Sequence, residues 1–160
     1  MAQSLVAVSD SVFPNLDLAR GVVSRVGAEL RMAAQPTPEE IVKVAKEADG
    51  LLVTYAKITA EMIGQMKRCR IISRFGIGVD NVDIAAATAS GIVVTKVPDY
   101  CIDEVSDHAM ALLLSLVRKI PFSSARAHAG RWEMPAVVPI HRLRGTVLGL
   151  VGFEIGRAHV

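Results

Sequence analysis

The stretch RIISRFGIGVD, residues 70–80, decides the fold because it joins a short apolar run to a glycine-rich turn. The run Arg70–Arg74 has the composition of a buried strand, and the alanine-rich segment Asp83–Ser90 after the turn is predicted to be helical. A further apolar run, Ile92–Thr95, comes directly after that helix. An apolar strand, a helix and another apolar strand in this order are typical of a parallel sheet that helices cover.

Three more strands are predicted on the N-terminal side of this stretch. The apolar runs are Leu5–Val8, Ala28–Met32 and Leu51–Thr54. Between the first two runs, apolar residues recur at helical spacing, namely at Leu16, Leu18, Ala19, Val22, Val23 and Val26. Thr37 and Thr59 precede two further amphipathic segments, at positions suited to an N-cap. Strand and helix therefore alternate five times, which predicts an α/β fold with helices on both faces of a parallel sheet.

A long helix is predicted at about Asp103–Lys119, because acidic residues lie near its start and basic residues near its end. Its middle, Ala109–Val117, is apolar nearly all round and is therefore expected to be buried on more than one side. Pro121 is expected to end this helix. A helix of this kind either links two domains or lies in the centre of one.

The chain beyond that helix is predicted to contain a shorter polar helix, Phe122–Trp132, and an irregular linker, Met134–Leu143. Arg144–Thr146 is predicted to be a turn, and Val147–Phe153 is predicted to begin a new buried strand. A parallel strand needs a crossover and a partner strand. The few residues that follow Phe153 are too short to supply them.

Composition excludes several classes of protein. Hydrophobic residues make up 51% and charged residues 21%, which is typical of a globular domain. A net charge of +2 with scattered Lys and Arg gives no basic stripe for nucleic acid. We expect a cytoplasmic protein, because no signal peptide is evident and the longest apolar run, Ala109–Leu114, is too short to span a membrane. Cys69 and Cys101 form no CxxC pair and are expected to be free thiols.

The glycine-rich turn is the first feature with chemical meaning. Gly76 and Gly78 permit positive φ and close approach of the backbone, so successive N–H groups can point at an anion such as a carboxylate. A plain tight turn explains the same residues equally well. His108, with Glu104 one turn earlier, has the spacing of a base and its orienting partner, but a side chain at that place in a long helix commonly faces solvent. No residues have the spacing of metal ligands.

A second glycine cluster lies near the C-terminus. Binding of a dinucleotide pyrophosphate uses the pattern G-x-G-x-x-G at a strand-to-helix turn. The segment GFEIG, residues 152–156, departs from this pattern, because the second glycine is missing and the spacing is one residue too short. Glu154 would also put negative charge where a phosphate must lie. As written, the dinucleotide motif is broken.

Several blocks of the sequence resemble the D-isomer-specific 2-hydroxy-acid dehydrogenases. In order, they are RIISRFGIGVDNVD (70–83), GIVVTKVP (91–98), EVSDHA (104–109), GRW (130–132) and RGTVLGLVGF (144–153). The segment VPDYC (97–101) looks closest to the bacterial branch named after the C-terminal binding protein, and phosphoglycerate dehydrogenases are close relatives. The resemblance spans residues 1–153 and is specific, because unrelated blocks appear in one order at plausible spacing.

The resemblance implies a division of the chain. Residues 1–98 would be the substrate-binding domain, a flavodoxin-like parallel sheet with flanking helices. Residues 99–144 would be a connecting helix and linker, and residues 145–160 the start of an NAD-binding Rossmann domain that is truncated after its first strand. The family's catalytic Arg, Glu and His lie downstream of the dinucleotide motif. No residue of this chain is therefore assigned to catalysis.

The resemblance also assigns binding residues, without any metal ion. The substrate carboxylate would be held by five residues of two strand-end loops: Tyr55, Ala56, Gly76, Ile77 and Gly78. Val105 would approach the nicotinamide from the substrate side, and Gly152 and Phe153 would contact the cofactor.

The implied function is that of an oxidoreductase that moves a hydride between NAD(H) and a small 2-oxo or 2-hydroxy acid, with NADP as an alternative cofactor. The complete protein would form a homodimer, with neither nucleic acid nor a membrane as partner, and the present chain alone would be inactive. One alternative is a nucleotide-sensing binding module, as in the corepressor members of the branch. Another is a stand-alone flavodoxin-like domain, against which the apolar helix argues because such a surface needs cover.

The tail Glu154–Val160 is the main departure from the family, which would read Gly-Phe-Gly-x-Ile-Gly at this point. These residues are what GAG-ATC-GGA-AGA-GCA-CAC-GTC would encode, which looks like a common sequencing adapter. We hypothesise that this tail is artefactual and that the natural protein continues after Phe153. The source DNA beyond that codon tests this, since genuine genomic sequence encoding the tail would contradict it.

Overall fold

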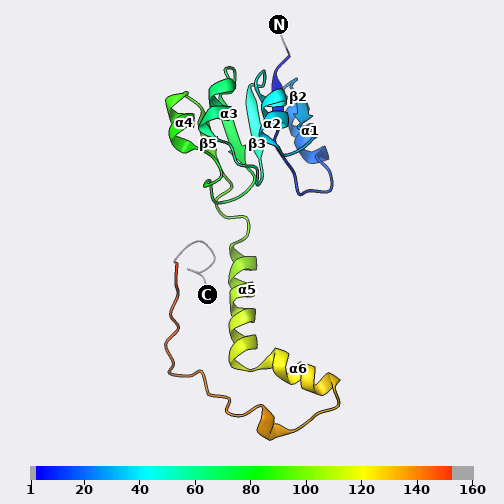
Figure 1. The fold of residues 1–160 in the computed structure, drawn as a ribbon, viewed down its shortest axis with the longest axis vertical. Helices are drawn as coiled ribbons and strands as arrows, with labels where there is room; N and C mark the ends of the chain where they lie inside the picture. Colours follow the sequence, from blue (N-terminus) through cyan, green and yellow to red (C-terminus); the bar gives the residue numbers. More distant parts are fainter. Residues whose placement is uncertain (1–2, 153–160) are drawn as a thin grey trace. The chain divides into compact units, whose positions relative to one another are not determined.

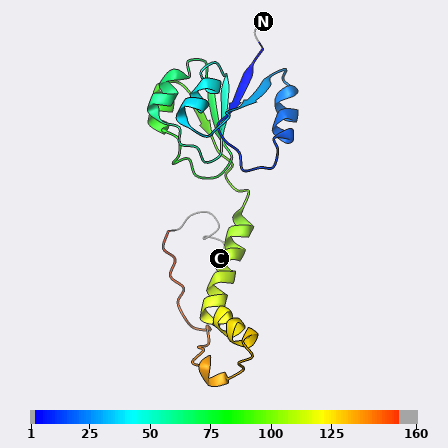
Figure 2. The same ribbon diagram turned by 45° about the vertical axis from the view of Figure 1, so that its right-hand side comes forward.

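The computed structural model describes residues 3–152. The chain divides into two compact units, Met1–Pro98 and Asp99–Val160. The first unit contains the sheet, and the second contains two helices and an irregular segment, as Figures 1 and 2 show.

The first unit is built on a parallel sheet with the strand order β2-β1-β3-β4-β5. The strands are β1 (Leu5–Val8), β2 (Glu29–Met32), β3 (Gly50–Val53), β4 (Ile71–Arg74) and β5 (Val93–Thr95). Every pairing is parallel. The predicted α/β fold is confirmed, and each predicted strand end lies within one residue of the observed end.

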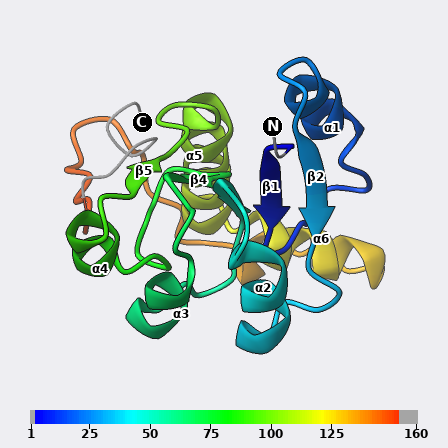
Figure 3. The same ribbon diagram turned by 90° about the horizontal axis from the view of Figure 1, so that it is seen from above.

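Four helices join these strands: α1 (Asp17–Ser24), α2 (Pro38–Ala45), α3 (Ala60–Gln65) and α4 (Ile84–Ala89). The crossover from β1 to β2 runs in the opposite direction along the sheet from the later crossovers. Because such crossovers are right-handed, α1 lies on one face of the sheet and the other helices on the opposite face. Figure 3 shows α1 on one side of the row of strands and α2 and α3 on the other.

Side chains begin three of these helices. The hydroxyl oxygens of Thr37 and Thr59 accept hydrogen bonds from the amides of Glu40 and Met62, in both cases at 3.4 Å. The carboxylate of Asp83 accepts from the amide three residues later at 2.9 Å. The two threonine caps predicted from the sequence are confirmed, and each fixes the start of a helix on the same face of the sheet.

The core lies almost entirely on the face that α2, α3 and α4 cover. Strand residues such as Ala7, Leu51 and Ile72 are buried there against helix residues such as Ile41 and Ile63. On the opposite face, α1 contains no buried residue, and Ile71 and Val93 are 41% and 58% exposed. Helices therefore cover the two faces unequally.

The second unit begins with α5 (Ile102–Val117) and α6 (Ile120–His128). Lys119, in the left-handed conformation with φ of 55°, makes the turn between them. Pro121 lies in the first turn of α6. α5 ends at Val117, four residues before Pro121, which agrees with the expectation that this proline ends the long helix, because a proline cannot donate to the carbonyl four residues earlier and its ring clashes with it. Proline is tolerated in the first turn of α6, where its missing N–H needs no partner.

No residue of α5 is buried, and Leu112 and Leu116 are 60% and 76% exposed. The expectation that this helix is buried on more than one side is therefore wrong for the described chain. The physical reason is a lack of covering surface: within its own unit α5 packs against α6, a helix of nine residues that follows it directly. No helix within residues 3–152 combines the length and the apolar character that a membrane span requires.

A single turn of 3₁₀ helix, Met134–Ala136, interrupts the irregular segment that follows. The turn predicted at residues 144–146 is present, because the Thr146 amide donates to the Leu143 carbonyl at 3.0 Å and Gly145 has a φ of 86°. The predicted strand from Val147 is wrong for residues 147–152, which are irregular, with Val147 96% exposed. A strand needs a neighbour for its backbone hydrogen bonds, and the described residues supply none here.

Candidate functional site

The candidate site lies at the carboxyl ends of three adjacent strands, where ligands bind in open α/β sheets. The sheet register places the end of β1 beside that of β3, through the pair Val8 and Leu52, and the end of β3 beside that of β4, through Val53 and Arg74. The segments that follow these strands are residues 9–10, 54–58 and 75–80. Both loops predicted from the sequence to hold a substrate therefore lie at one edge.

The carboxylate of Asp10 connects two of these strand ends. Its Oδ1 accepts hydrogen bonds from the Thr54 amide at 3.0 Å and the Ser9 hydroxyl at 2.6 Å, and its Oδ2 accepts from the Tyr55 amide at 2.7 Å. In return, the Thr54 hydroxyl donates to the Asp10 carbonyl at 3.1 Å. Sequence reasoning did not single out Asp10.

The same contacts set the charge of Asp10. Partial burial raises the pKa of its carboxyl, because desolvation disfavours the charged form. Hydrogen bonds from the Ser9 hydroxyl and from the amides of Tyr55, Thr54 and Ala56 outweigh burial and hold the pKa below its ordinary value. Asp10 is therefore an ionised carboxylate whose charge is satisfied by donors of the protein itself.

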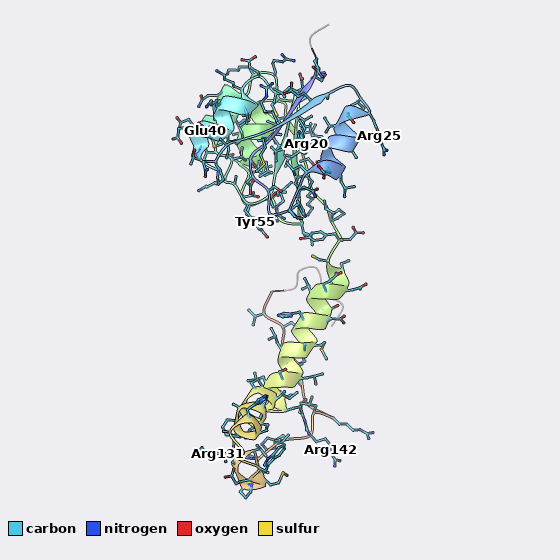
Figure 4. All side chains as sticks on the ribbon, turned by 90° about the vertical axis from the view of Figure 1, so that its right-hand side faces the viewer. Arg20, Arg25, Glu40, Tyr55, Arg131 and Arg142 are labelled. Atoms are coloured by element: carbon cyan, nitrogen blue, oxygen red, sulfur yellow. The ribbon has the colours of Figure 1, made fainter. Side chains whose placement is uncertain are left out.

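This arrangement changes the part that the loop of Tyr55 and Ala56 can play. The Tyr55 amide of this loop, which was predicted to help hold a substrate carboxylate, already donates to Asp10. The side chain of Tyr55 is 69% exposed, and Figure 4 shows it projecting outward from one end of the first unit. Any contact of Tyr55 with a ligand would therefore come from its ring and hydroxyl.

Asn81 holds the same loop from the other side. Its Nδ2 donates to the Ala56 carbonyl at 3.0 Å and, over a longer 3.4 Å, to the Thr54 carbonyl. The carbonyl of Asn81 accepts from the Ile58 amide at 2.7 Å. Asp10 thus accepts hydrogen bonds from amides of the loop, and Asn81 donates hydrogen bonds to its carbonyls. Together these contacts restrict the backbone of residues 54–56. Sequence reasoning did not single out Asn81.

Steric space, more than the backbone angle φ, explains the glycines of the glycine-rich turn. Neither Gly76 nor Gly78 has a positive φ, so that part of the expectation is wrong. A Cβ at Gly76 would overlap the guanidinium of Arg74. The Gly76 amide donates to the Arg74 carbonyl at 2.9 Å. Within residues 3–152 the amides of Ile77 and Gly78 make no hydrogen bond.

Arg74 is the cation of this edge. Its guanidinium lies over the Tyr55 ring, with 5.9 Å between Cζ and the ring centroid, and its buried Nε has no hydrogen-bond partner. No ion pair is found for it among residues 3–152. Sequence reasoning placed Arg74 in the strand and assigned it no binding role. The signal available was an arginine at the end of an apolar strand, immediately before the glycines.

An apolar pocket of about 320 Å³ adjoins Phe75, the residue between Arg74 and the glycines. Its other lining residues come from the loop after β1 and from α1: Phe13, Pro14, Asn15, Leu16, Leu18 and Ala19. The rings of Phe13 and Phe75 meet edge to face, 5.6 Å apart. The edge therefore combines a cation, two unbonded amides and, at Gly78, the Asp80 carboxylate with apolar surface nearby.

The residues predicted to bind the cofactor do not form a site within the described chain. Val105 lies on α5 and is 37% exposed, Gly152 lies in irregular chain, and Phe153 is outside the described residues. A dinucleotide cradle requires a strand, a glycine turn and a helix N-terminus together. Residues 147–152 do not supply these elements by themselves, so the assignment of Val105, Gly152 and Phe153 to cofactor binding stays a prediction. His108 is exposed on α5, as expected, and residues 3–152 contain no cluster of three potential metal ligands.

Comparison with known proteins identifies the family. Residues 6–147 match the family described as D-isomer specific 2-hydroxyacid dehydrogenase, catalytic domain. The chain belongs to this family. Among its relatives is the D-3-phosphoglycerate dehydrogenase of Archaeoglobus fulgidus, which is 36% identical over 137 residues, covering 82% of this chain and 26% of that protein. The chain thus spans about a quarter of the length of such relatives.

Solved structures of the family agree with this fold. The NADPH-dependent glyoxylate/hydroxypyruvate reductase of Sinorhizobium meliloti, in complex with citrate, superimposes with a TM-score of 0.78 and 28% identity, covering 99% of this chain and 49% of that chain. The NAD⁺-bound 3-phosphoglycerate dehydrogenase of Entamoeba histolytica gives a TM-score of 0.64 and 28% identity over 74% of this chain and 40% of that chain. The five-stranded parallel sheet is that of the family's substrate domain.

Proposed function

We propose that this chain is the carboxylate-holding part of an NAD-dependent oxidoreductase that interconverts a 2-hydroxy acid and a 2-oxo acid. The observation that carries the proposal is the edge formed by Arg74 and the glycine-rich turn: the guanidinium, which has no ion pair within residues 3–152, lies against Gly76, and the next two residues, Ile77 and Gly78, have amides without a hydrogen bond there. Charge-assisted hydrogen bonds from such groups are the strong ones for a carboxylate. Membership of a family that acts on 2-hydroxy acids supports the same ligand.

Within this proposal each group has one task. The amides of Ile77 and Gly78 bind the carboxylate, and Arg74 supplies the positive charge beside them. Gly76 keeps open the space that the guanidinium occupies. The Tyr55 ring contacts the guanidinium, and this cation–π contact favours its present direction. Ala56 contributes through the backbone that Asn81 holds.

The division of the chain follows from the same proposal. Residues 1–98 would bind the substrate, residues 99–144 would connect, and residues 145–160 would lead into a nucleotide-binding domain of the complete protein. Val105, Gly152 and Phe153 are proposed to contact NAD or NADP once that domain is present. The exposed leucines of α5 support a homodimer of the complete protein through this helix. No residue of this chain is assigned the role of the family's general acid, so we expect no oxidation of NADH with glyoxylate or hydroxypyruvate by the purified 160 residues.

A titration tests the carboxylate site directly. We expect pyruvate to shift the ¹⁵N–¹H signals of Ile77 and Gly78 in the labelled chain, and acetate, which lacks the 2-oxo group, to do so more weakly. Gly76→Ala forces the flexible Arg74 guanidinium aside and should weaken pyruvate binding on the order of tenfold. The matched control is Gly64→Ala on α3, where a Cβ meets nothing within 4 Å. Unshifted Ile77 and Gly78 signals at saturating pyruvate would refute the proposed site.

A further inference from the structure

Asp10 is the most heavily hydrogen-bonded side chain at the candidate site, yet the proposed function gives it no task. We propose that Asp10 is a positioning residue: it fixes the backbone after β3 so that Tyr55 and Arg74 stay in place beside the free amides of Ile77 and Gly78. This inference rests on the proposed function.

The first step of the argument is the geometry at the carboxylate. The two oxygens of Asp10 accept from two consecutive amides, at 3.0 Å from Thr54 and 2.7 Å from Tyr55. Two acceptors in one rigid plane fix the direction of both peptide groups, which a single hydrogen bond would not do. The Ser9 hydroxyl, itself 1% exposed, holds one of those oxygens in turn at 2.6 Å.

The second step runs from this backbone to the cation. Tyr55 leaves the fixed peptide with its ring under the Arg74 guanidinium, and that guanidinium occupies the space above Gly76. Asp10 thus acts on Arg74 through one intervening residue. Outside this contact and the crevice at Gly76, nothing within residues 3–152 anchors the guanidinium, because it has no ion pair there.

The third step concerns charge. A carboxylate at this edge would repel the carboxylate of a 2-oxo acid if its charge were free. In Asp10 the hydroxyl and amide donors occupy both carboxylate oxygens, so hydrogen bonds within the protein stabilise its negative charge. Asp10 can therefore organise the site without competing with the ligand for Arg74.

The test compares two aspartates of the same sheet. Asp10→Asn keeps the shape of the side chain but turns an N–H donor toward one of the two amides, so the loop must move. Asp49→Asn is the matched control, because Asp49 also accepts a backbone amide, that of Leu5 at 2.9 Å, across an equal sequence separation. Both variants are titrated as ¹⁵N-labelled 160-residue chains with pyruvate, following Ile77 and Gly78.

We expect Asp10→Asn to weaken pyruvate binding on the order of tenfold, the loss typical when an outer partner of a binding group is removed, and Asp49→Asn to leave it unchanged. Ser9→Ala keeps the carboxylate and removes one donor; we expect binding about threefold weaker, which decides the matter if Asp10→Asn does not fold. Wild-type affinity in Asp10→Asn, or in Ser9→Ala where Asp10→Asn is unfolded, overturns the positioning role alone. An equal loss in Asp49→Asn also overturns it. Absence of pyruvate binding in the wild-type chain overturns the proposed function, and this inference with it.

Discussion

At the carboxyl edge and at the amino edge of the sheet, an aspartate side chain accepts hydrogen bonds from the backbone, but the two aspartates have different roles. At the carboxyl edge, Asp10 accepts two amides from the loop after β3 and is itself held by Ser9. At the amino edge, Asp49, just before β3, accepts the single amide of Leu5 and pairs with Arg68 at 2.9 Å. In each case an aspartate joins β1 to β3, which are neighbouring strands in the sheet. Only at the carboxyl edge does the joined loop carry groups suited to bind a ligand.

The difference shows that one kind of hydrogen bond, from a backbone amide to an aspartate, can stabilise the fold at one edge and orient a loop of the candidate site at the other. The amino edge needs only to keep β1 in register, and one amide with a partly exposed ion pair does so. The carboxyl edge must also set the direction of a loop. This requires both oxygens of Asp10, which accept from amides of the loop, and Asn81, which donates to the Ala56 carbonyl. Binding sites generally need support of this kind from residues that do not contact the ligand.

The largest expected effect on stability separates these two aspartates. Asp10→Asn should lower the free energy of unfolding by about 3 kcal/mol, because a charged acceptor of several hydrogen bonds is replaced by a group that opposes one of the donors. Asp49→Asn should cost about 1 kcal/mol, since its amide oxygen can still accept from Leu5. Urea denaturation of both variants measures the difference. Equal losses would contradict the distinction between the edges.

Lowering the pH should destabilise the fold through both aspartates, by less than the Asp10→Asn substitution does. The pKa of Asp49 is lowered by the hydrogen bond from the Leu5 amide and then by Arg68, and that of Asp10 is lowered by the donors around it. A carboxyl whose pKa is lower in the folded chain stabilises the fold above its ordinary value of 3.8, and this contribution is lost as the pH falls through the folded value.

We therefore expect the urea midpoint to be flat near neutral pH and to fall below about pH 4. Either Asp→Asn variant should fall less steeply than the wild type, because one of the two linked protonations is gone. A variant curve that runs parallel to the wild-type curve would show that the substituted aspartate contributes nothing to the acid response.

The smallest effect is expected from the ion pair at the amino edge. Arg68→Met should cost at most about 1 kcal/mol, because the Arg68 and Asp49 side chains are 45% and 32% exposed and water screens their attraction. The loss should shrink further in 1 M salt. A loss of unfolding free energy that is large, or that salt does not reduce, would show that the ion pair between Arg68 and Asp49 stabilises the amino edge more than expected.

Much of this fold could be predicted from local patterns. Short apolar runs gave the strands to within a residue, and Thr37 and Thr59 marked helix starts, because such signals act over a few positions. The exposed state of α5 and the missing strand after Gly145 could not be predicted in this way. Both depend on whether a partner surface is present, which no local pattern records.

The site was predicted only in outline for a similar reason. The glycine-rich turn and the loop of Tyr55 stood out by composition, but their supports did not. Asp10 meets its amide partners 44 and 45 residues away, and Asn81 lies 25 residues from Ala56. An aspartate after a strand is too common to signal such a contact. Arg74 was overlooked because its role arises from the space that Gly76 leaves.

The unequal cover of the two sheet faces bears on how this unit can be handled. Ile71 and Val93 are register partners on adjacent strands, so their exposed side chains lie next to each other on the face that α1 covers only in part. Such a patch favours association of molecules at high concentration. Val93, the more exposed of the two, is where a polar β-branched residue such as threonine would raise solubility while keeping the strand, because it alters a surface that folding barely uses.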